Sequence, residues 1–303
     1  MRETGAPYGE ARRLRYFVIA CKELLELPSV DIDLFINKLL EATSNLNSQL
    51  DQYLRATGIM QSHAVARNYL RFADWLDFLR IENRIVVPNS YTVFFANING
   101  RKDFFLTERE KTAFFLKLVE LEDFIRLIGL LRIKNSINAY IRLLDLSEHL
   151  VESYFEWLVD LGILKPIQRK FGLFELSNLG YQLRESIRND SQQLKVCGTY
   201  IEHLVGVRLD YDFRISERQI WDAFHKTLNK LGQHTQSEVD PGLYSAYPLI
   251  LGLQIRLIFD HNLIVPIPFL IEKLKDISTN YNALFSWDSL ANAGYIKLQR
   301  EKK

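Results

Sequence analysis

Residues 53–95 read YLRATGIMQSHAVARNYLRFADWLDFLRIENRIVVPNSYTVFF. The tripeptide Thr57-Gly58-Ile59 predicts a turn that ends one helix, because glycine adopts backbone angles that other residues avoid. Ser62 is a typical N-cap for a second helix. In that second helix, apolar side chains fall at helical spacing on one face: Ala66, Tyr69, Leu70, Ala73 and Leu76. One side of this helix therefore packs, and the other is free to make contacts.

After Leu79 the pattern changes from helical spacing to short apolar runs. Residues 84–87 and residues 91–95 are β-branched and aromatic, and the segment Pro88-Asn89-Ser90 separates them. This composition favours strands joined by a turn. We therefore expect a β-hairpin to follow the second helix.

Composition sets the outer limits on the kind of protein. The chain has 303 residues and is 48% hydrophobic, which predicts two or three globular domains. We expect no membrane span, since the most apolar stretch, residues 247–274, is interrupted by charged residues. The N-terminus has no apolar secretion signal, and Cys21 and Cys197 form no disulfide framework. We therefore expect a cytoplasmic protein.

The charge of the chain is balanced. There are 38 basic and 37 acidic side chains, for a net charge of +1. This balance excludes the broad basic surface of a nonspecific nucleic-acid binder. Any contact with a nucleic acid must therefore come from a local patch.

The central pattern occurs a second time. Residues 151–161 align with residues 66–76 at their apolar positions, although most surface residues differ. Residues 166–176 then predict a second hairpin, with its turn at Lys170 to Gly172. The sequence LSNLGYQL at residues 176–183 starts a closing helix.

This order of helix, turn, helix and hairpin resembles the winged helix-turn-helix superfamily, over residues 30–98 and again over 108–188. The resemblance implies a three-helix core with a wing, in which the third helix often enters the DNA major groove and the wing touches phosphate or minor groove. Many relatives use the fold only for protein contacts, so the fold does not settle function. The expected class is mainly α with short β-hairpins (α+β).

The polar segment at residues 97–103 is the best candidate for a domain boundary. We expect a first winged-helix domain with an N-terminal arm over residues 1–98 and a second over 103–190. A helical C-terminal domain over 191–303 leaves two interpretations open. The apolar runs in its last part are either the wing of a third winged helix near residues 245–300 or irregular structure.

The two predicted third helices differ in charge. The first carries cationic and amide donors that suit guanine and adenine edges or phosphates. The second carries an acidic stripe that phosphate would repel: Glu148, Glu152, Glu156 and Asp160. The expected DNA-binding residues therefore lie mainly in the first copy, its wing, the N-terminal arm and the second wing: Arg55, Gln61, Ser62, His63, Arg67, Asn68, Arg71, Arg84, Asn89, Arg12, Arg13, Arg169 and Lys170.

The cationic stripe of the first copy and the arginines of the N-terminal arm each have an ordinary structural interpretation as well. Arginine and histidine at four-residue spacing also occur on an ordinary solvated helix face, where Asp74 or Asp77 could pair with them. Arg12 and Arg13 either follow the DNA minor groove, as some N-terminal arms do, or are ordinary surface arginines at the start of a helix.

Motifs for catalysis are missing from the sequence. There is no HExxH, no Cys/His metal spacing and no glycine-rich phosphate loop. Asp222 and His225 lie three residues apart, which also fits a local hydrogen bond on a helix. Acidic residues near 210–217 and 238–240 are of the kind usually solvated in loops. We therefore expect no enzyme, no metal and no cofactor.

Two functions remain open. In the first, the protein binds double-stranded DNA without catalysis, as a regulator or as the DNA-recognition subunit of a mobile-element or defence system. In the second, it is a scaffold subunit of a multi-protein ATPase or nuclease complex. Its partner proteins would then meet the acidic helix at residues 147–160 and the C-terminal part. The sequence leaves the DNA target, the partners and the oligomeric state open.

Overall fold

The computed structural model describes residues 9–27, 29–53, 59–98, 105–167, 172–189, 192–211 and 214–299. These residues are mainly helical with small three-stranded antiparallel sheets, which confirms the expected α+β class. The chain divides into two compact units, one of Met1–Asn89 with Asn99–Gly206 and one of Ser90–Ile98 with Val207–Lys303. Among the described residues, every helix is too short or too polar to cross a membrane.

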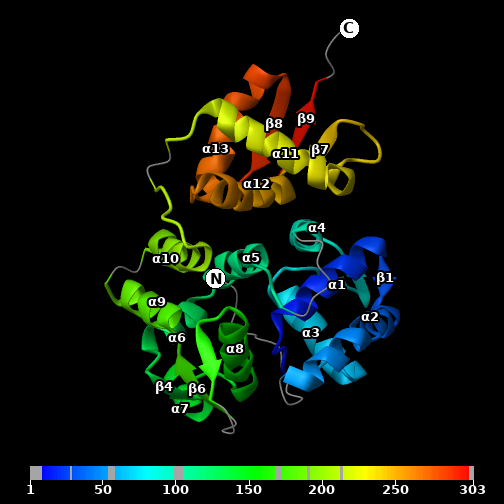
Figure 1. Ribbon diagram of the computed structural model, residues 1–303. Helices are drawn as coiled ribbons and strands as arrows, with labels where there is room; N and C mark the ends of the chain where they lie inside the picture. The colour runs from blue at the N-terminus through cyan, green and yellow to red at the C-terminus, as the bar shows by residue number, and fades with distance from the viewer. Residues whose placement is uncertain are drawn as a thin grey trace. The chain divides into compact units, whose positions relative to one another are not determined.

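The first part of the first unit combines helices with short strands, and Figure 1 labels α1, β1, α2 and α3 among them. They follow one another as α1 (Leu14–Glu26), β1 (Val30–Asp31), α2 (Ile32–Tyr53), α3 (His63–Trp75), β2 (Arg80–Glu82) and β3 (Ile85–Val87). The strand that precedes α2 pairs antiparallel with the last strand, so the sheet order is β1-β3-β2.

The second part of the same unit repeats this order. After α5 (Glu108–Leu118) come α6 (Glu122–Leu130), β4 (Lys134–Ser136), α7 (Ile137–Leu144), α8 (Glu148–Asp160), β5 (Leu164–Pro166) and β6 (Leu173–Leu176). The last strand again lies between the other two, in the sheet order β4-β6-β5. The helices α9 (Asn178–Asn189) and α10 (Gln193–Val205) complete the unit.

The second unit contains the same order a third time. It consists of α4 (Ser90–Asn97), α11 (Glu217–Thr235), β7 (Leu243–Ser245), α12 (Ala246–His261), α13 (Ile267–Ser278), the 3-10 helix η1 (Thr279–Tyr281), β8 (Ala283–Asp288) and β9 (Ala293–Leu298). The apolar runs near the C-terminus pair as a regular hairpin, with Leu284 opposite Lys297, and are not irregular. The sheet order β7-β9-β8 matches the other two.

The first two copies agree in backbone detail at the end of their third helices. Asp77 and Gly162 both have positive φ, at 65° and 79°. In both copies the amide of the following residue donates a hydrogen bond to a main-chain oxygen of the helix. The amide of Phe78 donates to Ala73 O at 2.7 Å, and the amide of Ile163 donates to Leu158 O at 2.8 Å. The left-handed residue therefore turns the chain from the helix into the hairpin in the same way twice.

The first hairpin lies elsewhere than its sequence predicted. Its strands are β2 and β3, joined at Asn83 and Arg84, which both have positive φ, as a tight two-residue turn requires. Residues 91–95, expected as a strand, form helix α4 instead. Tyr91 in α4 packs edge-on against Tyr247, and their hydroxyl groups lie 3.0 Å apart. This packing decides the conformation, because a short apolar run fits a buried helix as well as a strand.

Other expectations fall partly outside the described residues. Strands β5 and β6 pair as expected, with Leu164 opposite Leu176, whereas residues 168–171 of their turn are not described. The expected turn at Thr57-Gly58 also lies outside the described residues. Residues 90–98, expected in the first domain, pack with the second unit.

Candidate nucleic-acid interface

Helix α3 begins at a capped end and shows two different faces. The hydroxyl of Ser62 accepts a hydrogen bond from the amide of Val65 at 3.3 Å, which fixes the first turn. One face is buried: Ala66, Tyr69, Leu70, Phe72 and Ala73. The other face and the residues just before it are exposed and include five of the thirteen expected donors: Gln61, Ser62, His63, Arg67 and Arg71.

Two arginines of the expected site converge on one carboxylate from α2. Arg67 Nη2 lies 2.9 Å from Asp33 Oδ1, and Arg84 Nη2 lies 2.6 Å from Asp33 Oδ2. The hydrogen bond from Arg67 has the largest effect on the pKa of Asp33 and, together with the bond from Arg84, lowers it below its ordinary value of 3.8, while removal from water acts in the opposite direction. His63, one turn before Arg67, lies 2.7 Å from the side-chain oxygen of Asn37, also on α2. Two members of the cationic stripe, His63 and Arg67, are therefore already held by the start of α2.

The remaining expected residues are placed differently. Asn89 donates to the main-chain oxygen of Asp77 at 2.8 Å and so belongs to the turn after α3. Asn68 is half-buried, and a Cβ added at Gly9 would lie 2.2 Å from its amide nitrogen. Three other expected residues lie outside the described residues: Arg55, Arg169 and Lys170.

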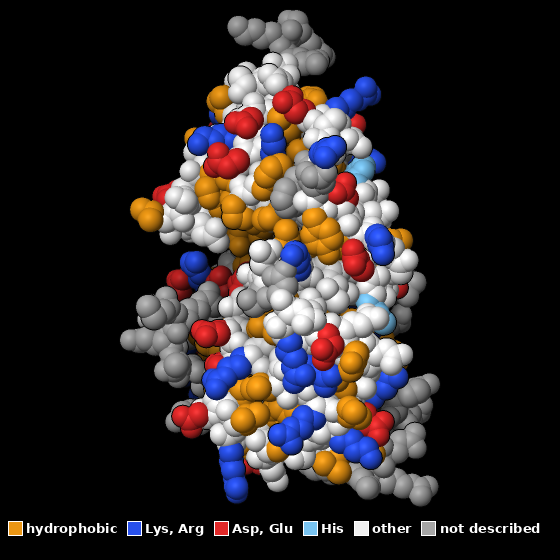
Figure 2. Space-filling view, turned by 90° about the vertical axis from the view of Figure 1, so that its left-hand side faces the viewer, with side chains coloured by type: hydrophobic (Ala, Val, Ile, Leu, Met, Phe, Trp, Pro, Cys, Tyr) orange, Lys and Arg blue, Asp and Glu red, His pale blue; other side chains and the backbone are white. Residues whose placement is uncertain are grey.

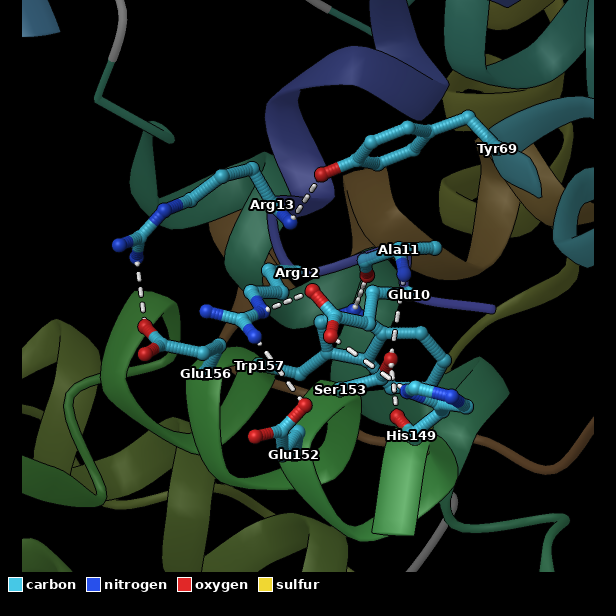
Figure 3. A network of polar contacts seen from close by, with 10 residues as sticks. All are labelled: Glu10, Ala11, Arg12, Arg13, Tyr69, His149, Glu152, Ser153, Glu156 and Trp157. Atoms are coloured by element: carbon cyan, nitrogen blue, oxygen red, sulfur yellow. Dashed lines mark hydrogen bonds and ion pairs between the residues drawn. The ribbon is translucent and has the colours of Figure 1, made fainter. Parts of the chain in front are cut away.

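Arg12 and Arg13 bind the acidic face of α8 (Figure 3). Arg13 Nη1 lies 3.1 Å from both Glu156 Oε2 and Asp160 Oδ1, and Arg12 Nη2 lies 3.1 Å from Glu152 Oε2. Arg13 is 1% exposed. This corrects the expectation that the two arginines form a free arm for the minor groove, because buried and paired guanidinium groups offer no surface to DNA.

The main chain beside these arginines binds both third helices. The amide of Ala11 donates to Ser153 Oγ at 3.2 Å on α8, and the amide of Arg13 donates to the hydroxyl of Tyr69 at 2.8 Å on α3. Residues 9–13, here called the strap, therefore lie between the two helices and cover the acidic face of α8 (Figure 3). Three of the four carboxylates expected to attract a partner protein, Glu152, Glu156 and Asp160, are used within the chain, whereas Glu148 is exposed.

Removal from water has the largest effect on the pKa values of Glu156 and Asp160, which lie under the strap. Removal from water raises the pKa of Glu156 and of Asp160 above their ordinary values, although the nearby Arg13 guanidinium acts in the opposite direction. Asp160 also accepts a hydrogen bond from the amide of Leu14 at 2.9 Å. The Arg13 guanidinium and the main-chain amide of Leu14 therefore bind carboxylates that are partly removed from water, and these contacts hold the strap.

One group of side chains near the strap has the composition of a metal site. Glu10, His149 and Glu152 each place one ligand atom within 4.8 Å of the others. The Arg12 guanidinium, however, lies 2.7 Å from Glu10 and 3.1 Å from Glu152. A metal cation there would face this guanidinium at close range, so the group fits an ion-pair network better than a metal site.

Sequence reasoning missed Asp33 and the strap. Asp33 sits in the first turn of α2, where an acidic residue is ordinary, and nothing in its spacing connects it with α3. One feature of the sequence could have predicted the strap, since the charge of two adjacent arginines complements a stripe of acidic residues. The two segments, however, lie about 140 residues apart.

Figure 2 shows basic and acidic side chains mixed with apolar ones on the face it presents, consistent with only local charge patches.

Comparison with known protein families, with curated proteins and with solved structures gave no match for this chain.

Proposed function

We propose that the protein binds double-stranded DNA without catalysing a reaction, through α3 and the β2–β3 hairpin. In this proposal it is a cytoplasmic regulator or the DNA-recognition subunit of a mobile-element or defence system. Each of the three copies has the order helix, strand, helix, helix, strand, strand, and its first strand pairs with its last. This order is that of a winged helix, and we assign all three copies to that fold.

The contrast between α3 and α8 carries the proposal. These helices occupy the same place in the first two copies, where a DNA-binding winged helix would present its recognition helix. The strap covers the acidic face of α8, whereas Arg67 and Arg71 remain exposed on α3. One of the two matched helices is therefore open to a polyanion, and it is the cationic one.

The chemistry of the open helix suits a duplex. Guanidinium groups bind phosphate and can bind guanine through two parallel hydrogen bonds. Arg67 lies in the middle of α3 and Arg84 lies in the hairpin turn, so helix and hairpin both contribute donors. Because the net charge is only +1, affinity must come from these few contacts rather than from a general basic surface.

A salt series tests the proposal. Fluorescence anisotropy of a labelled random-sequence duplex should show affinity that falls with salt, because phosphate contacts release counterions. Arg71→Ala should weaken binding and reduce the slope of log affinity against log salt by about one. The matched control is Arg218→Ala, which removes an exposed helical arginine from α11.

Equal losses in Arg71→Ala and Arg218→Ala would mean that only general charge matters. Salt-independent or undetectable binding of the unaltered protein would refute the proposal.

The C-terminal hairpin favours a second candidate function, a scaffold subunit of a multi-protein complex. Leu290 in the turn between β8 and β9 is 98% exposed, and Leu284 and Tyr295 on its strands are also exposed. Such residues suit a protein contact better than a phosphate contact. Purification with a stoichiometric partner that is lost in Leu290→Ser, while DNA binding is absent, would support this function.

A further inference from the structure

We propose that Arg67 and Arg84 form a phosphate-binding site and that the Asp33 carboxylate acts as an internal competitor for it. The inference rests on the proposed DNA binding by α3 and the first hairpin. It adds a residue that limits affinity, because the carboxylate must leave both guanidinium groups before a DNA phosphate can bind them.

The geometry resembles that of a bound anion. Each carboxylate oxygen of Asp33 binds a different arginine, at 2.9 Å to Arg67 and 2.6 Å to Arg84. The two guanidinium groups thus point at the same small space from different elements. A phosphate presents two non-bridging oxygens that can take the same two positions, and charge-assisted bonds of this kind are among the stronger ones in proteins.

The backbone holds the two arginines in place independently of the carboxylate. The main-chain oxygen of Arg84 accepts a hydrogen bond from the amide of Ile32 at 2.8 Å, which ties the hairpin turn to the start of α2. Arg67 is anchored within α3 between the buried residues Ala66 and Tyr69. Removal of the Asp33 charge should therefore leave both guanidinium groups near the same space.

Solvent exposure makes the carboxylate exchangeable. The side chains of Arg67, Arg84 and Asp33 are 45%, 70% and 47% exposed. Exposed ion pairs contribute little, because water solvates both partners when they separate. The Arg13–Asp160 pair is the opposite case, since its side chains are only 2% and 12% exposed and cannot exchange partners freely.

The competitor has two measurable effects on DNA binding. A phosphate must displace Asp33 and then bind beside its negative charge. Asp33→Asn should therefore tighten duplex binding by about threefold, because exposed ion pairs contribute only a small free energy. The Asp33 charge also offsets part of the positive charge of Arg67 and Arg84, so the unaltered site neutralises less of the DNA phosphate charge. In Asp33→Asn the site should neutralise about one more phosphate and release its condensed counterion from the DNA, and the salt slope should become steeper by about one.

Two measurements on the full chain test the inference. The first compares duplex affinity and salt slope for the unaltered protein, Asp33→Asn and the control Asp145→Asn, which removes an exposed carboxylate after α7 in the second copy. The second follows the side-chain NMR signals of Arg67 and Arg84 during titration with inorganic phosphate. We expect tighter duplex binding, a steeper slope and stronger phosphate response in Asp33→Asn alone.

The outcomes separate this inference from the proposed function. Unchanged affinity, slope and phosphate response in Asp33→Asn would overturn the competitor role while leaving DNA binding intact. Equal gains in Asp33→Asn and Asp145→Asn would also overturn it, since net charge alone would explain them. A phosphate response at Arg67 and Arg84 without any duplex binding would support the anion site and refute the DNA-binding function.

Discussion

The indole Nε1 of Trp157 donates a hydrogen bond to the main-chain oxygen of Ala11 at 2.5 Å. Trp157 is a fully buried side chain of α8, and Ala11 lies in the strap. The contact therefore joins the N-terminal segment to the second copy across a sequence separation of 146 residues. The same indole packs edge-on against Phe17 of α1 and Phe72 of α3. Trp157 is thus a centre of packing between the two copies in the first unit.

Trp157→Phe should destabilise the first unit. Phenylalanine keeps an aromatic ring but has no donor, so the buried oxygen of Ala11 loses its partner, at a cost of about 2 kcal/mol. Urea unfolding followed by circular dichroism measures the loss. The control is Trp287→Phe on the half-buried face of β8 in the second unit. Equal effects of both changes would show that the Ala11 contact contributes nothing specific.

Arg13→Met should be among the most destabilising single changes of an arginine in this chain. It leaves Glu156 and Asp160 partly buried without the cation that binds both, and such a loss costs about 3 kcal/mol. Arg67→Met provides the comparison, because its pair with Asp33 is exposed and should cost much less. Chemical denaturation of both variants gives the difference, and similar values would contradict a tightly bound strap.

Stability should depend on pH through the carboxylates under the strap. Burial raises the pKa of Glu156 above 4.5 and that of Asp160 above 3.8, so the folded state binds more protons than the unfolded state in the window above these values. The free energy of unfolding should therefore decrease as pH rises through that window. Glu156→Gln should flatten this decrease in unfolding measured from pH 4 to 7. A steeper decrease in the variant would show that the sign of the shift is wrong.

Gly162→Ala should destabilise the protein through its backbone alone. Gly162 has φ of 79°, and a Cβ added there would meet nothing within 4 Å. The cost of holding alanine in the left-handed region is about 1 kcal/mol. Gly162→Asn should lose less, because asparagine tolerates this region better and Asp77 holds it in the first copy. Thermal unfolding ranks the variants, and an asparagine variant as unstable as alanine would contradict this explanation.

The sequence was most informative where local interactions decide the structure. The Ser62 cap and the apolar face of α3 follow from neighbours within one or two turns, and the structure confirms both. The repeat of this unit around α8 also follows from spacing. Prediction was wrong at residues 91–95, because the strand preference of a short β-branched and aromatic run is weak enough for tertiary packing to override it. Packing of Tyr91 on Tyr247, 156 residues away, makes it a helix.

The candidate site divides in the same way. The sequence by itself determined the opposite charges of α3 and α8, because helical spacing places residues four apart on one face. Only the tertiary structure decided which face is open: the strap brings Arg13 to Asp160, and the start of α2 brings Asp33 to Arg67 and Arg84. The physical reason is that ion pairs form between any segments that the folded core brings together. Their partners are therefore set by packing and are not encoded in the spacing of either segment.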